Sequence, residues 1–98
     1  MEETKVDLSR LKEKLEMLTG FDLEEAEMEE RAAGNIAPDI VFSKRFQARL
    51  AAKALGVHPD DMRALKASQY TFATATVSNF LFGDLAEEKG VRQINTEK

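Results

Sequence analysis

Few residues of this 98-residue chain could do chemistry, and its single histidine is the first of them. His58 has neither a second imidazole nor a cysteine thiolate with which to share a metal ion. It precedes Pro59, whose fixed backbone suits the first turn of a helix, so we expect a turn residue. Asp60 and Asp61 follow, and adjacent residues on a helix point about 100° apart. The group therefore predicts a helix start, where carboxylates favour the helix dipole, and not a catalytic pair.

The Glu-rich stretch at residues 24–30 is the other candidate for chemistry. Its carboxylates could hold a divalent cation only weakly, because the stretch lacks the glycine and the alternating oxygen ligands of a calcium loop. The sequence also lacks a glycine-rich phosphate loop, a nucleophile elbow and a catalytic triad. We therefore expect a protein that is not an enzyme and that has no cofactor and no metal site.

Charge is divided unevenly along the chain. Residues 1–34 contain 11 acidic and 5 basic side chains, whereas residues 40–59 contain no acidic side chain. The basic side chains of that second segment are Lys44, Arg45, Arg49 and Lys53. We expect the acidic and basic segments to lie side by side within the fold, with an acidic partner as the alternative. The acidic balance argues against nucleic acid as a partner.

Helix signals divide the chain into short elements. A leucine repeat of three and four residues, closed by Gly20, predicts a first amphipathic helix; it consists of Leu8, Leu11, Leu15 and Leu18. Asp22 resembles an N-cap and predicts a second helix from Leu23 to Gly34. A loop with Pro38 follows. Ser43 then caps a helix that runs to Leu55, with Gly56 past its end, and a short helix follows Pro59.

Residues 67–83 contain no charged side chain and predict a long helix that begins near Ser68 and ends at Gly83. The segment is short and rich in hydroxyl groups, so we expect no membrane span. One side of the helix should pack in the core: Tyr70, Ala73, Val77, Phe80 and Leu81. Phe72, Asn79 and Phe82 fall on the opposite side, where they are either a second core wall or a docking surface.

Together these signals predict an all-α, single-domain bundle of about five helices around the uncharged helix. We expect the domain to span residues 1–83 and the charged residues 84–98 to form a flexible tail. The N-terminus resembles neither a signal peptide nor a transit peptide, which favours the cytoplasm.

Two alternative functions follow from local patterns. The segment from Leu50 to Met62 resembles a helix-turn-helix, since Gly56 occupies the turn position of that motif. A DNA-binding regulator would, however, present Asp60 and Asp61 to phosphates. The leucine repeat at residues 8–18 is compatible instead with a self-associating structural module, and hence with a homo-oligomer.

Three segments in succession resemble the tail assembly chaperones of long-tailed bacteriophages and prophages. The first is LTGFDLEEAEMEERAAG, with a Leu-Thr-Gly-x-Asp-Leu opening at residues 18–23. The second is FSKRFQARLAAKALGVHPDDMRAL, an alanine-rich helix with a glycine turn. The third is LKASQYTFATATVSNFLF, which ends in Val-x-x-Phe-Leu. The likeness lies in the order of these pieces and covers residues 18–34 and 42–82.

This resemblance implies a small helical protein that binds the helical tape measure protein in the host cytoplasm and is absent from the mature virion. It further implies the tail tube protein as a second contact, because tube subunits displace such chaperones. From the helical wheel, we expect the partner-binding surface to consist of Phe72, Asn79 and Phe82, with Phe42 and Phe46 added and Arg45, Arg49 and Lys53 as a charged rim.

Overall fold

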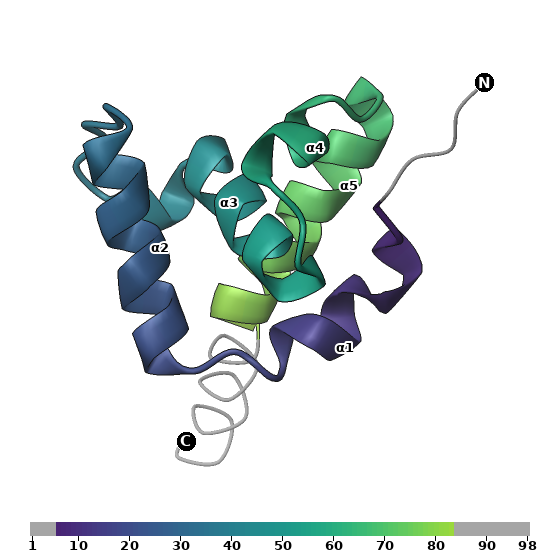
Figure 1. Cartoon of the computed structure of the whole chain (residues 1–98). Helices are drawn as coiled ribbons and strands as arrows, with labels where there is room; N and C mark the ends of the chain where they lie inside the picture. Colours follow the sequence, from purple (N-terminus) through teal and green to yellow (C-terminus); the bar gives the residue numbers. More distant parts are fainter. Residues whose placement is uncertain (1–5, 84–98) are drawn as a thin grey trace, which may run out of the picture.

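The computed structural model describes residues 6–83, and these residues form helices joined by short turns (Figure 1). The α-helices are α1 (Leu11–Leu15), α2 (Gly20–Ala32), α3 (Lys44–Leu55), α4 (Pro59–Arg63) and α5 (Ala67–Ser78). Short 3-10 turns, η1 (Leu8–Arg10) and η2 (Ile40–Phe42), precede α1 and α3, and a π turn, η3 (Asn79–Gly83), continues α5. The described residues contain no strand, so the predicted all-α fold is confirmed.

Helix α3 lies at the centre of the bundle and packs against α1, α2, α4 and α5. Alanines at three positions of α3 are buried and allow its neighbours to approach closely: Ala48, Ala51 and Ala52. Phe46 and Leu50 of the same helix are also buried. The expectation of a central uncharged helix is thus corrected, because α5 packs on one side of α3 and leaves its own outer side exposed (Figure 1).

The leucine repeat contributes to this same core. Leu11 and Leu15 are fully buried, while Leu8 and Leu18 are half-buried against the core. The regular part of the helix is shorter than expected, since α1 proper covers only residues 11–15. The leucine repeat therefore packs inside its own chain and does not present a free seam for self-association.

Helix α2 begins three residues earlier than the expected start at Leu23. The N-cap is Thr19, not Asp22: the Asp22 N–H donates to Thr19 Oγ1 at 3.4 Å, and the Thr19 N–H donates to Asp22 Oδ2 at 2.9 Å. This reciprocal pair is a capping box, so Asp22 is its third helical residue. Met28 is exposed on the far side of α2.

The α3 to α4 connection follows the sequence signals closely. The Phe46 N–H donates to Ser43 Oγ at 3.3 Å, and Gly56 ends α3 in a left-handed conformation with φ of 73°. His58 caps α4, since its Nδ1 accepts a hydrogen bond from the Asp60 N–H at 3.0 Å. Helix α5 starts at Ala67, one residue before the predicted start near Ser68, and Ser68 does not cap it, because the N-cap position is Lys66 and has no side-chain hydrogen bond.

Two expectations concern residues beyond those described. The flexible tail at residues 84–98 lies outside the described part of the chain, as do residues 1–5 of the expected domain. Within residues 6–83, the helices are not long and apolar enough to cross a membrane.

Candidate partner-binding surface

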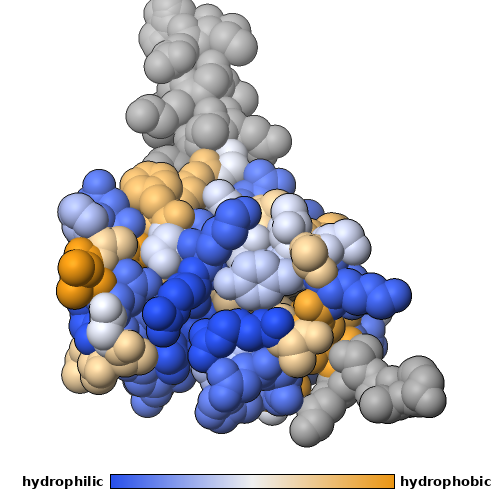
Figure 2. Space-filling model, turned by 90° about the horizontal axis from the view of Figure 1, so that it is seen from above, coloured by the Kyte–Doolittle hydropathy of each residue, from blue (hydrophilic) through white to orange (hydrophobic). Residues whose placement is uncertain are grey.

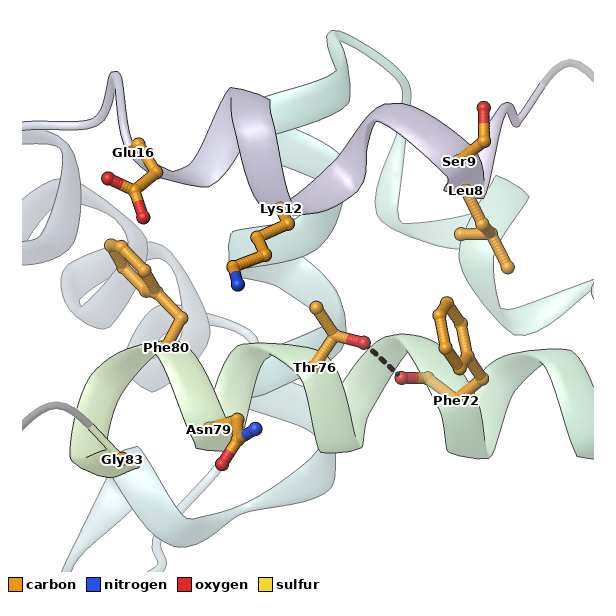
Figure 3. A pocket seen from close by; sticks show the side chains of 9 residues that line it. All are labelled: Leu8, Ser9, Lys12, Glu16, Phe72, Thr76, Asn79, Phe80 and Gly83. Atoms are coloured by element: carbon orange, nitrogen blue, oxygen red, sulfur yellow. Dashed lines mark hydrogen bonds between the residues drawn. The ribbon is translucent and has the colours of Figure 1, made fainter. Parts of the chain in front are cut away.

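A groove lies between the η1 to α1 segment and the outer side of α5 (Figure 3). Its volume is about 700 Å³. One wall carries Leu8, Ser9, Lys12 and Glu16, and the other carries Phe72, Thr76, Asn79, Phe80 and Gly83. The groove is thus formed by residues from the two ends of the described chain, held on opposite sides by their packing against α3.

The groove has apolar ends and a polar middle. Figure 3 shows Leu8 and Phe72 pointing toward one another at one end, while Phe80 lies near Glu16 at the other. Lys12 points into the space between them and makes no ion pair with the described residues. Such an arrangement can accept an amphipathic segment.

The outer side of α5 is exposed, as one of our two interpretations required. Phe72 is 55 % exposed and Asn79 is exposed as well. The opposite side packs in the core, where Ala73 and Val77 are fully buried. Phe72 is therefore not the second wall of the bundle but an aromatic ring open to solvent.

Phe82, near the C-terminal end of the described residues, forms a pair with Phe42 of η2. Their ring centroids are 4.8 Å apart and their planes differ by 13°, which is a stacked arrangement. Phe82 is half-buried, while Phe42 is 63 % exposed. Each ring therefore covers part of the other, and the pair offers less free apolar surface than its two rings would separately.

Phe46 does not belong to the surface. It is fully buried in α3, one turn before Leu50, because α3 is covered on several sides. The expectation that Phe46 contributes to partner binding is therefore corrected: its side chain is part of the core.

The basic residues of α3 pair with the acidic residues of α2. Arg49 Nε lies 2.6 Å from Glu30 Oε1, Arg45 Nε lies 3.2 Å from Glu30 Oε2, and Lys53 Nζ lies 3.0 Å from Glu25 Oε1. The expected juxtaposition of the two charged segments is confirmed. These three residues were predicted to form a charged rim for a partner. About half of the Arg45 side chain is exposed and can do so, whereas the side chains of Arg49 and Lys53 are only 15 % and 20 % exposed.

Glu30 is the buried acceptor of this network. Its Oε2 also accepts from Asn35 Nδ2 at 2.9 Å, and Asn35 reaches Ser43 Oγ at 3.0 Å. Burial alone would raise the pKa of Glu30, but the hydrogen bonds from Arg49 and Asn35 and the nearby charges outweigh it and lower the pKa. The carboxylate therefore stays charged and joins α2, the following loop and α3.

The residues that could do chemistry have structural roles or stand apart. His58, Asp60 and Asp61 form the start of α4, and residues 6–83 contain no cluster of three or more metal-ligating side chains. The segment that resembles a helix-turn-helix does contain a glycine turn, at Gly56. Its second helix, α4, has only five residues, and Met62 is buried. A helix of that length is too short to follow the major groove as a recognition helix.

Sequence reasoning missed one wall of the groove. The spacing of Leu8, Lys12 and Glu16 could have indicated this wall, because residues four apart share one row of a helix. Which row of α1 would face α5 depends on how both helices pack on α3, and the spacing does not determine that.

Comparisons of the chain with protein-family models, with curated proteins and with solved structures found no match.

Proposed function

We propose that this chain is a non-enzymatic helix-binding protein, a tail assembly chaperone that binds the tape measure protein of a long-tailed bacteriophage or prophage. The observation that carries the proposal is the groove between α1 and α5, beside which Phe72 is 55 % exposed. Because an exposed aromatic ring next to a groove is a common anchor for a partner, this is the surface at which we place the client.

The dimensions and chemistry of the groove suit a helix. Phe72 of α5 and Asn79, the first residue of η3, are seven residues apart, a rise of about 10 Å, which matches two turns of a client helix. Leu8 with Phe72 and, at the other end, Phe80 would receive apolar side chains, and Lys12 and Asn79 would meet polar ones. The client is therefore an amphipathic helix bound through one face.

The sequence resemblance gives this helix binder its biological setting. The Leu-Thr-Gly-x-Asp-Leu opening becomes the Thr19 cap and first turn of α2, and the alanine-rich segment becomes the central α3. We place the protein in the host cytoplasm, on the tape measure protein, until polymerising tail tube subunits displace it. A groove of limited apolar area fits this role, because a client that must be released has to be held weakly.

Co-expression with the tape measure protein of the same genome tests the proposal. The wild-type chain is expected to copurify with a soluble tape measure protein, and Phe72→Asp is expected to abolish the complex, since it places a charge where an apolar anchor is required. Ile36→Asp is the matched control, because Ile36 is 88 % exposed and lies in the loop after α2, away from the groove.

Thermal unfolding of each variant separates binding from folding. Phe72→Asp should unfold near the wild-type temperature because the ring is exposed. A complex that persists with Phe72→Asp, or one that Ile36→Asp disrupts to the same degree, would refute the groove as the client site. A tape measure protein that never associates with the folded wild-type chain would refute the function itself.

A further inference from the structure

Helix α2 presents a second apolar surface, on the side that faces away from α3. Ala26 and Glu30 are buried on the inner side. Phe21 and Met28 lie two turns apart on the outer side and are 82 % and 70 % exposed. Residues seven positions apart on a helix differ by only about 20° in direction, so the two side chains form one stripe.

Carboxylates flank this stripe on both sides. Glu24 and Glu27 lie on one flank, beside a shallow hollow of about 550 Å³ that Met28 and Arg31 also line, and neither carboxylate has an ion pair or hydrogen bond with the described residues. On the other flank, Glu25 and Glu29 pair with Lys53 but keep 59 % and 43 % of their side chains exposed. The Arg31 guanidinium donates to the backbone oxygens of Asn35 and Ala37.

We infer that the outer face of α2 binds a basic amphipathic helix of a partner protein, at a surface separate from the α1 to α5 groove. An apolar row on the partner would cover Phe21 and Met28, and Lys or Arg residues beside that row would meet the two acidic flanks. A methionine in the stripe suits such docking because its side chain adapts to the shape of the partner. Figure 1 places α2 on the opposite side of the bundle from α1.

Charge complementarity distinguishes this partner from other occupants. Nucleic acid is repelled by the carboxylates. A second copy of this chain would have to offer a basic helical row, and the row formed by Arg45, Arg49 and Lys53 is already paired with α2 of its own chain. Figure 2, a view of the whole molecule from above, shows hydrophilic side chains across the middle and hydrophobic ones in separate groups toward the edges.

A peptide-binding measurement with the full chain tests the inference. The probe is a labelled synthetic helix of about 18 residues with leucines at helical spacing flanked by lysines. A scrambled peptide of the same composition is the control for charge alone. By fluorescence anisotropy, we expect the helical probe to bind at least about tenfold more tightly than the scrambled one, and less tightly as salt is added.

Variants locate the binding surface. Phe21→Ser combined with Met28→Ser should weaken binding of the probe about tenfold or more, and so should Glu24→Lys combined with Glu27→Lys. Phe72→Ser, which changes the groove, should leave it unchanged. Phe21, Met28 and Glu24 are exposed and Glu27 is half-buried, and none of the four belongs to the core, so circular dichroism melting should match the wild-type chain.

Three results would overturn the inference. If the scrambled peptide bound as tightly as the helical probe, the binding would depend on the overall charge of the peptide and not on an apolar helical row. Loss of probe binding in Phe72→Ser but not in the α2 variants would show that the probe binds in the α1 to α5 groove. A wild-type dimer in sedimentation, lost in the Phe21→Ser and Met28→Ser variant, would assign the face to a second copy of the chain. The tape measure complex is tested separately, with Phe72→Asp.

Discussion

Arg49 Nε donates a hydrogen bond of 2.6 Å to Oε1 of Glu30, and the Glu30 side chain is fully buried between α2 and α3. A buried carboxylate loses its hydration, and the loss is offset only when its oxygens are bonded. Here Arg49, Arg45 and Asn35 supply those bonds. Because α2 otherwise has a narrow apolar side, with Ala26 and half-buried Leu23, this network fixes the position of α2 on α3.

Glu30→Ala should therefore destabilise the fold by about 2 to 3 kcal/mol, at or just below the usual range for removing one partner of a buried pair, because Arg49 keeps some access to water. Urea unfolding followed by circular dichroism measures the change. Glu24→Ala is the control, since Glu24 is exposed and unpaired among the described residues; it should change stability by less than about 0.5 kcal/mol. Equal effects of the two substitutions would contradict the role of the network.

Acidification should remove the contribution of Glu30. Its pKa in the folded chain lies below the ordinary 4.5, so the unfolded chain binds this proton first as the pH falls. The stabilisation is therefore complete above pH 4.5 and is lost as the pH falls through the lowered pKa of the folded state. The difference in unfolding free energy between wild type and Glu30→Gln should shrink on acidification. Asp7 and Glu13, whose pKa values are also lowered, are common to both chains and cancel. A difference that stays constant down to about pH 3 would contradict this assignment.

Much of the fold could be predicted because its signals are local. Ser43, Gly56 and Pro59 mark helix ends through backbone geometry that depends only on near neighbours, and the structure confirms each of them. The start of α2 was predicted three residues too late because Asp22 can serve either as an N-cap or as the third residue of a capping box. Only the conformation of Thr19, which is extended, decides between these two roles.

The candidate site was harder to predict because exposure depends on packing. The wheel separated Phe72 from Val77 correctly, since both lie on one helix. It could not show that Phe46 is covered, because that follows from the helices that surround α3. Nor could it place Lys12 opposite α5, which depends on two helices meeting across a third.

Two glycines should respond oppositely to alanine. An added Cβ at Gly20 or Gly56 would meet no atom within 4 Å, so space does not distinguish them. Gly56, however, has φ of 73°, a left-handed conformation that alanine adopts at a cost of about 1 kcal/mol. Gly20 lies in the first turn of α2, where alanine should raise stability by about 0.5 kcal/mol. Melting temperatures of the two variants check the prediction, and a shift of the same sign in both would contradict it.

The stack of Phe42 on Phe82 should stabilise the fold more than it binds a client. A double-mutant cycle with Phe42→Ala and Phe82→Ala should give a coupling of about 0.5 to 1 kcal/mol in unfolding, as for other aromatic pairs. In the tape measure complex, Phe42→Ala should weaken binding less than Phe72→Ala, because Phe42 has part of its ring covered by Phe82 whereas Phe72 adjoins the groove. Binding constants of both variants, measured with chains shown to be folded, give the ranking. The reverse order would make the stacked pair, and not the groove, the main anchor for the client.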